Sequence, residues 1–236
     1  MSTRARLSRA SAPEAATQSL GPKPAATITD VAYIGGAGRS GSTVLALLLG
    51  KVQGFFPVGG VNNLWERGLL HNYLCGCGVH FRECPFWNEV GREAFGGWDA
   101  VDAHEIMRLK SAITRYRHWP WHLAPALRPP FRNALVSYSD YLGRVYAAIK
   151  SVSGCTVIVD NSHDPMPALV LHRTPGIRPK VLHLVRDSRG VAFSLARYVL
   201  RIEATMAQTY MPRYSSAKAS MEWVTASLWA LQTSTA

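Results

Sequence analysis

The sequence predicts an α/β fold of three layers, in which a mostly parallel sheet lies between helices. Three short runs rich in apolar and β-branched residues have the length of buried strands, at residues 31–34, 156–160 and 180–185. Segments with helical apolar spacing alternate with these runs, which is typical of parallel sheets. With 236 residues, 47% of them hydrophobic, the chain can bury one substantial core, so we expect a single domain over residues 28–236.

The first segment is predicted to form a flexible basic tail. Residues 1–27 are rich in Ser, Ala and Pro and contain one acid, Glu14, a composition that cannot build a packed element. An acid-poor start rich in Arg and Ser also fits an organelle transit peptide, whereas a secretory signal is excluded because no apolar core follows the arginines. The basic residues of the tail are Arg4, Arg6, Arg9 and Lys23.

The run at residues 31–34 leads into a glycine-rich loop and then a helix. Glycines occupy positions 35, 36, 38 and 41, and helical apolar spacing begins at Val44, with Ser42 and Thr43 expected as helix caps. Such a loop turns successive backbone N–H groups toward one concavity, and the helix adds its unpaired N-terminal donors. We therefore expect a phosphate or sulfate group to bind there.

Residues 36–43 match the spacing G-x-x-x-x-G-x-[ST] of a phosphate-binding loop. Ser42 stands where a nucleotide triphosphatase has the lysine that reaches the terminal phosphates, and the cation within the loop is Arg39. This departure argues against ATP or GTP hydrolysis. A glycine-rich turn without a ligand remains the alternative interpretation of the loop taken alone.

The other predicted elements follow from apolar spacing and from turn residues. The Trp119-Pro120-Trp121 corner and the prolines at 125, 129 and 130 are expected to break the helical pattern of residues 102–116. The predicted segments are a strand and turn at 54–60, a helix beginning near residue 62, helices at 102–116 and 133–152, and a last helix at 221–231.

Three polar residues are expected at the ends of predicted strands. Thr43 and Arg186 closely follow two of the strands, and Asp160 closes a third. Ligands of open parallel sheets bind beyond the carboxyl ends of the strands. We therefore expect these three residues to gather at one edge of the sheet.

Cys75, Cys77, His80 and Cys84 place four residues of metal-ligand type within ten positions. Structural zinc sites usually separate paired cysteines by two to four residues, whereas one residue separates the first pair here. Buried thiols, a disulfide and a metal site are the three alternatives, and we assign no metal to the functional site. Four cysteines in a chain of this length do not make a disulfide scaffold, which favours a reducing compartment, the cytoplasm.

The net charge of +11 fits nucleic acid, an anionic membrane or an anionic small molecule. Nucleic-acid binding is not expected, because the chain has no reader motif. Residues 108–132 hold six basic residues, no acid and a Trp-Pro-Trp corner, which fits a solvated basic face over buried tryptophans. This region also permits peripheral contact with an anionic membrane, although no apolar run is long enough to cross one. The sequence does not indicate an oligomeric state.

Residues 180–195 form a second strand and helix that carry polar residues. Arg186 and Asp187 end the strand, and Ser194 lies on the helix. Together with the glycine-rich loop, this segment resembles the sulfotransferases that use 3′-phosphoadenosine-5′-phosphosulfate (PAPS), the activated sulfate donor. Further pieces resemble the bacterial branch of this family, namely residues 64–69, Cys75-Gly-Cys-Gly, residues 84–87 and residues 159–165.

The resemblance implies a P-loop-like fold similar to that of nucleotide kinases, with PAPS as co-substrate and no required metal. It implies that Arg186 and Ser194 hold the 3′-phosphate, and that Arg39 neutralises charge on the departing oxygen. The acceptor would be a hydroxyl or amine of a small molecule, a glycan or a lipid. The resemblance implies that residues 108–132 recognise it, because related sulfotransferases vary in this region. The loop residues implied to hold the 5′-phosphosulfate are Gly38, Arg39, Ser40, Gly41, Ser42 and Thr43.

The chain departs from the family at the expected base. Relatives commonly carry a glutamate where this chain has Gly60. His163 and Glu66 are the candidate replacements, since an imidazole titrates near neutral pH and Glu66 is predicted within two helical turns of the missing acid. The alternatives are that Glu66 is a solvated helix residue paired with an arginine, and that His163 donates to the phosphosulfate or caps the turn at Asp164.

The family resembled here continues beyond the last predicted helix of this chain. We therefore expect the domain to lack a C-terminal segment that closes over the 3′-phosphate and adenosine. Two alternatives to an active sulfotransferase follow. One is a remnant that binds the donor without turnover, and the other is a P-loop nucleotide kinase, which would need magnesium and a lysine at position 42.

Overall fold

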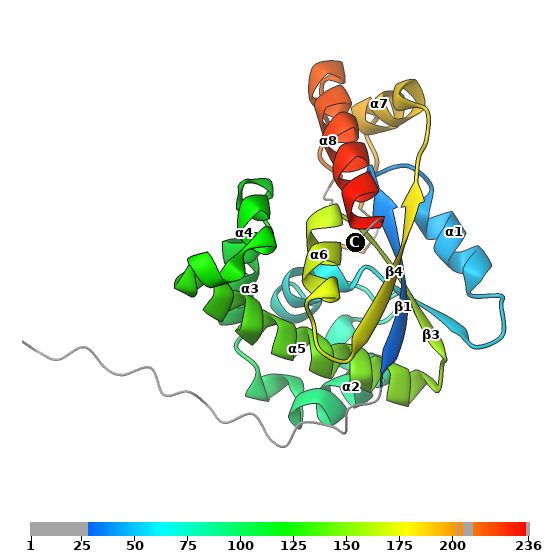
Figure 1. Ribbon diagram of the computed structural model, residues 1–236. Helices are drawn as coiled ribbons and strands as arrows, with labels where there is room; N and C mark the ends of the chain where they lie inside the picture. The colour runs from blue at the N-terminus through cyan, green and yellow to red at the C-terminus, as the bar shows by residue number, and fades with distance from the viewer. Residues whose placement is uncertain (1–27, 202, 205–209, 235–236) are drawn as a thin grey trace, which may run out of the picture.

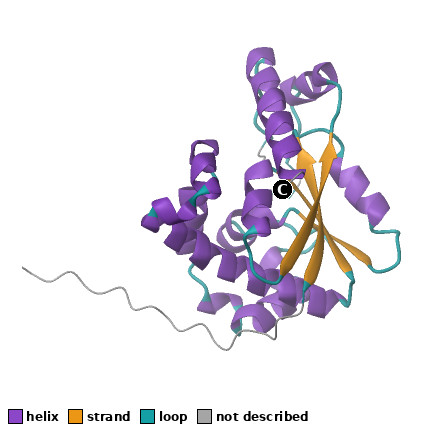
Figure 2. Ribbon diagram, in the orientation of Figure 1, coloured by secondary structure: helices purple, strands orange, loops and turns teal. Residues whose placement is uncertain are grey.

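The computed structural model describes residues 28–201, 203–204 and 210–234, so the tail predicted at residues 1–27 lies outside the described residues. The described chain forms one sheet of four strands, all parallel, in the order β2-β3-β1-β4. The predicted α/β class and parallel sheet are confirmed (Figures 1 and 2). The strands are β1 (Thr29–Gly36), β2 (Phe55–Gly59), β3 (Val157–His163) and β4 (Ile177–Leu184).

Helices connect and cover these strands. Irregular turns of helix at Val61–Asn63 and Leu64–Leu70 follow β2, as the sequence predicted for the segment after residue 62. None of the described helices is both long enough and apolar enough to span a bilayer. The α-helices are α1 (Ser42–Leu49), α2 (Pro85–Phe95), α3 (Ala103–Ile113), α4 (Trp119–Leu123), α5 (Pro129–Ser153), α6 (Pro165–His172), α7 (Ser188–Ala196) and α8 (Ser216–Ser234).

Prolines begin helices in this chain, which corrects part of the sequence prediction. Pro129 and Pro130 occupy the first turn of α5, where a missing N–H is tolerated, so this helix starts before the predicted residue 133. The helix predicted at 102–116 ends at Ile113, and the side chain of Asp102 caps its start by accepting two backbone N–H groups.

Helices pack on both faces of the sheet. On one face, Ala46 of α1 packs against Ala32 and Val159 in a small apolar cluster. On the other face, Tyr33 and Ile158 belong to a larger core that includes side chains of α2, α3, α5 and α6. Figure 1 shows α1 on one side of the sheet and α5, α6 and α8 on the other, an arrangement compatible with three layers.

The larger core is centred on Trp65, which is fully buried. Its ring centroid lies 6.4 Å from those of Phe95 and Trp98 and 6.2 Å from that of Tyr141. These partners come from α2, from the turn after it and from α5, so one side chain ties three segments together. Large aromatic side chains dominate the burial energy of a core, and this cluster holds the helical layer against the segment after β2.

The carboxyl end of β3 is irregular. Tyr33 of β1 pairs with Asp160, but two residues later Gly35 pairs with His163, so β3 carries one extra residue there. The prediction that this strand ends at Asp160 is therefore wrong, because the strand continues to His163. Asp160 is 1% exposed, accepts hydrogen bonds from Tyr146 and Ser162, and has a carboxyl pKa raised by burial.

Candidate functional site

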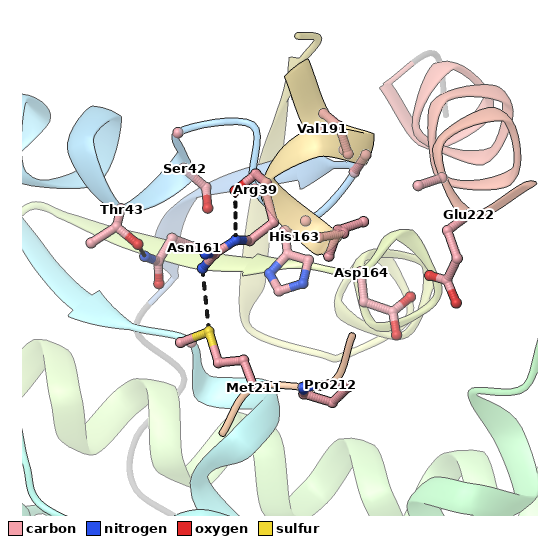
Figure 3. A pocket seen from close by; sticks show the side chains of 18 of the residues that line it. Arg39, Ser42, Thr43, Asn161, His163, Asp164, Val191, Met211, Pro212 and Glu222 are labelled. Carbon is pink, nitrogen blue, oxygen red and sulfur yellow. Dashed lines mark hydrogen bonds between the residues drawn. The ribbon is translucent and has the colours of Figure 1, made fainter. Parts of the chain in front are cut away.

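A cavity of about 880 Å³ lies beyond the carboxyl ends of the strands. The loop after β1, the end of β3 and the residues after β4 all line it, together with side chains from α7 and α8. Figure 3 shows the labelled side chains converging on this space from segments far apart in the sequence. The position is where open parallel sheets bind ligands, and the volume is that of a small-molecule site.

The glycine-rich loop adopts a backbone that its glycines permit. Gly36 has φ 137°, and a Cβ there would lie 2.3 Å from the carbonyl oxygen of Leu184, so no larger residue fits. Arg39 also has a positive φ of 69°, and Gly41, with φ 96°, is the N-cap of α1. The prediction that Ser42 and Thr43 cap this helix is therefore wrong: the left-handed cap conformation requires Gly41, and both residues lie within the first turn.

The start of α1 is open to an anion. The first backbone bond of the helix joins the N–H of Leu45 to the carbonyl of Gly41, so the preceding N–H groups of the first turn have no acceptor within the helix. No side chain caps these groups, and the first turn contains no acid. Gly41, Ser42 and Thr43 all line the cavity. The positive end of the helix dipole therefore faces a space of ligand size.

Arg186 meets this loop directly. Its Nη1 donates a hydrogen bond to the carbonyl oxygen of Arg39 at 2.9 Å, across 147 positions of sequence. A Cβ at Gly190 would lie 3.1 Å from the Arg186 Nε, so this glycine makes room for the guanidinium beside α7. The indole N–H of Trp223 on α8 donates to the Arg186 carbonyl at 2.9 Å. The expected meeting of Arg186 with the glycine-rich loop is confirmed, and Thr43 lines the same cavity, whereas Asp160 is buried and is not among the lining residues.

Arg39 bridges the loop and α7. Its Nε donates to Ser194 Oγ at 3.1 Å, and its Nη1 lies 3.2 Å from the sulfur of Met211. Both partners are uncharged. Ser194 lines the same cavity as Arg186, so the two residues implied to hold a 3′-phosphate are brought together. Ser40 differs from its neighbours, because it does not line the cavity and its buried Oγ has no hydrogen-bond partner among the described residues.

His163 lies against the glycine-rich loop. A Cβ at Gly38 would be 3.5 Å from the imidazole Nε2, so the ring packs on the loop backbone. The residue has φ 54°, a left-handed conformation that the irregular end of β3 imposes. Figure 3 shows the ring between Arg39 and Asp164. On the other side of the loop, Asn161 Nδ2 lies 3.5 Å from Thr43 Oγ1.

An acidic side of the cavity was not predicted from the sequence. Figure 3 shows the carboxyl groups of Asp164 and Glu222 directed toward one another. Burial raises the pKa of Asp164, and the charge of Glu222 adds to this, although the N–H of Met166 and the charge of His163 act against it. Asp164 is also the N-cap of α6. The sequence signal for it was the Asp164-Pro165 pair, a common helix start, whereas Glu222 gave no local signal.

The cavity carries more positive than negative groups. Among the residues that the structure describes, five arginines line it against three carboxyl groups. Glu203 lies 3.5 Å from Arg67 and 3.9 Å from Arg201, so it partly neutralises both. Within the described residues, no carboxylate pairs with Arg39 or Arg186. These two guanidinium groups therefore remain available to an anionic ligand. The lining arginines are Arg39, Arg67, Arg186, Arg197 and Arg201, and the acids are Asp164, Glu203 and Glu222.

The structure separates the two candidate bases. Gly60 lines the cavity, and a Cβ there would lie 3.3 Å from Asn63 Nδ2, so the Asn63 side chain would have to shift slightly to admit one. Glu66 is exposed and is not among the cavity residues, while the neighbouring Arg67 is. Of the two, only His163 lies in the cavity, so the geometry gives no support to Glu66 as a base.

The basic region at residues 108–132 reaches the cavity at one residue, Tyr116. Burial raises the pKa of its hydroxyl, with a smaller contribution from the charge of Asp164. Trp121 is half-buried against the larger core, and the guanidinium of Arg128 lies 5.1 Å from its ring centroid. The aromatic corner is thus partly a packing feature, and the nearby Tyr116 lines the site.

No family model, no curated protein and no solved structure matches this chain, so its function is argued from the site itself.

Proposed function

We propose that this protein binds PAPS in the cavity and transfers its sulfonate group to a hydroxyl or amine of a small molecule, a glycan or a lipid. Under this proposal the fold is a P-loop-like relative of nucleotide kinases, with the glycine-rich loop as its anion site. The reaction would take place in the cytoplasm, with which four unbridged cysteines are consistent.

The observation that carries the proposal is the convergence of two cationic sites in one cavity. The first is the open N-terminus of α1 with Arg39, and the second is Arg186 with Ser194. The contact of 2.9 Å between Arg186 and the Arg39 carbonyl joins them. A nucleotide with phosphate groups at both the 5′ and 3′ positions can use both sites at once, whereas a simple nucleoside monophosphate uses one.

Nucleotide triphosphate hydrolysis is less well supported. Ser42 occupies the position of the P-loop lysine, and no lysine is among the described residues that line the cavity. The lysine normally reaches the β- and γ-phosphates. The cation of this loop is Arg39, and its Nε donates to Ser194 Oγ at 3.1 Å.

Sulfonate transfer would proceed in line. The acceptor oxygen or nitrogen forms a bond to sulfur while the bond from sulfur to the bridging oxygen breaks, and 3′,5′-adenosine bisphosphate leaves. The loop N–H groups and the Arg39 guanidinium neutralise the charge that develops on that oxygen. A base takes the acceptor proton, and His163, whose ring packs on the loop, is the base proposed here. Asp164, whose carboxyl pKa is raised by burial, lines the same cavity.

Calorimetric titration with 3′,5′-adenosine bisphosphate tests donor binding. We expect one bisphosphate per chain, with a Kd that is unchanged when magnesium is replaced by a chelator. Binding that requires magnesium, or tighter binding of ATP than of the bisphosphate, would favour a nucleotide kinase instead. A transfer assay with labelled PAPS and mixed acceptors then separates an enzyme from a binding remnant, since a remnant binds the bisphosphate but labels no acceptor.

A further inference from the structure

A tight turn between the cavity wall and α2 gathers three cysteines. The N–H of Cys75 donates to the Val79 carbonyl at 2.8 Å, and the N–H of Gly78 donates back to the Cys75 carbonyl at 2.9 Å. Gly78 has φ 91°, which closes the turn. Cys84 is the N-cap of α2 and faces this turn. Local backbone geometry therefore brings the segment of Cys75 and Cys77 onto the start of a helix.

The three sulfur atoms have the spacing of ligands around one cation. The Sγ atoms of Cys77 and Cys84 are 3.5 Å apart, those of Cys84 and Cys75 are 3.6 Å apart, and all three lie within 4.8 Å of one another. In a tetrahedral zinc site with Zn–S bonds of about 2.3 Å, the sulfurs lie about 3.8 Å apart. The cluster therefore has the dimensions of a thiolate site before any ligand is added.

Buried thiols and a disulfide both fit the cysteine motif less well than a metal site. Thiols packed under a loop would share burial, but Cys84 is buried, Cys75 is half-buried and Cys77 is exposed. A disulfide would draw one pair to about 2.0 Å and leave the third sulfur unused. Neither arrangement accounts for three sulfurs that all lie within 4.8 Å of one another. Cys155 shows the contrast, since it is buried and lies outside the cluster.

A cation that binds all three sulfurs must displace the protons of the thiols, which a divalent metal does by stabilising the thiolates.

We propose that Cys75, Cys77 and Cys84 bind one zinc ion through their thiolates, with solvent as the fourth ligand. The protons of the thiols pass to solvent on binding. His80 belongs to the same motif but not to the cluster, because its Nδ1 lies 2.8 Å from the Asn72 carbonyl and none of its ring nitrogens joins the three sulfurs. The site is structural and separate from sulfonate transfer, since none of the three cysteines lines the large cavity.

A zinc ion bound to the three cysteines would affect the large cavity through residues that line it. Leu74, next to Cys75, donates its N–H to the Glu203 carbonyl at 2.9 Å, and the Glu203 side chain pairs with Arg67. Both Arg67 and Glu203 line the large cavity, and both also line a smaller one of about 210 Å³ that Cys75 borders. A metal that fixes the turn would therefore hold this pair in place.

Metal content of the full chain tests the proposal. After incubation with zinc sulfate and desalting, we expect about one zinc ion per chain in the wild type and in Cys155→Ser, the matched control for the loss of one thiol. Cys77→Ser should retain its fold by circular dichroism, since Cys77 is exposed, and should fall to near zero zinc per chain. Wild-type protein without zinc, or Cys77→Ser with wild-type zinc content, would overturn the proposal.

A spectroscopic measurement on the wild-type protein tests the assigned ligands without requiring that any variant folds. Cobalt is expected to replace zinc and to give the near-ultraviolet band of thiolate-to-cobalt charge transfer, together with the visible bands of tetrahedral cobalt. Bound cobalt without the thiolate band would contradict the assigned ligands. Because this readout needs no nucleotide, its result does not depend on whether the protein binds PAPS.

Discussion

Replacing Arg186 by alanine separates the two anion sites of the cavity. The guanidinium donates to the Arg39 carbonyl at 2.9 Å and has no carboxylate partner among the described residues, so under the proposed function it also holds the 3′-phosphate. A hydrogen bond to a charged group contributes about 1.5 to 3 kcal/mol, which corresponds to roughly a 10- to 150-fold change in Kd. The hydrogen bond to the Arg39 carbonyl supports the loop. Losing this bond costs about 1 kcal/mol and weakens the binding of every ligand of the loop alike.

Calorimetry with two ligands distinguishes these effects. Adenosine 5′-monophosphate lacks the 3′-phosphate, so Arg186→Ala should weaken the binding of this nucleotide by no more than about fivefold. For 3′,5′-adenosine bisphosphate the same variant should weaken binding by roughly 10- to 150-fold more than it does for the monophosphate. Arg92→Ala is the matched control, because Arg92 is exposed and pairs only with Glu89 among the described residues. Equal losses for both nucleotides would refute the assignment of Arg186 to the 3′-phosphate.

Three further predictions concern particular residues. Gly36→Ala should abolish bisphosphate binding, because its Cβ would lie 2.3 Å from the Leu184 carbonyl oxygen and must displace the loop; wild-type affinity by calorimetry would show that the loop backbone is not required. Trp65→Ala should lower the free energy of unfolding by about 3 to 5 kcal/mol, measured by urea denaturation, and a loss below about 1 kcal/mol would mean that this side chain does not anchor the core. The carboxyl pKa of Asp164 is raised in the folded state, so its contribution to stability is fully present below the unfolded pKa and is lost as pH rises through the folded pKa. Asp164→Asn should therefore gain stability relative to the wild type as urea denaturations move from pH 4 to pH 7, and a constant difference would argue against the raised pKa.

Much of the fold could be predicted because its signals are local. Short apolar runs gave the strands, and the loop glycines gave a turn before a helix. Parallel strands end at a common edge of their sheet, so the placement of Arg186 near the loop followed from topology alone. Gly36 pairs with Leu184 in the register of β1 and β4, and this pairing is what fixes the loop beside Arg186.

The details of the site could not be predicted, since they depend on contacts between distant segments. The extra residue in β3 buries Asp160 and directs His163 to the loop, and no spacing in the sequence marks it. Glu222 enters the cavity because α8 packs beside α6 and α7. Asp164 and Glu222 are therefore visible as a pair only in three dimensions (Figure 3).

The cysteine motif shows the same limit. Its spacing left buried thiols, a disulfide and a metal site as alternatives, because sequence distance does not fix the separation of sulfur atoms. The turn at Gly78 and the start of α2 set that separation. His80 lies within the same ten positions as a fourth residue of metal-ligand type, but its ring contacts the Asn72 carbonyl instead.

A crystal structure with 3′,5′-adenosine bisphosphate is the most direct test of the account. We predict one nucleotide in the cavity of about 880 Å³, with the 5′-phosphate against the backbone N–H groups that begin α1 and the 3′-phosphate within hydrogen-bond distance of Arg186 and Ser194. A nucleotide bound elsewhere, or one whose 3′-phosphate faces solvent while Arg186 keeps only its contact with the Arg39 carbonyl, would contradict it.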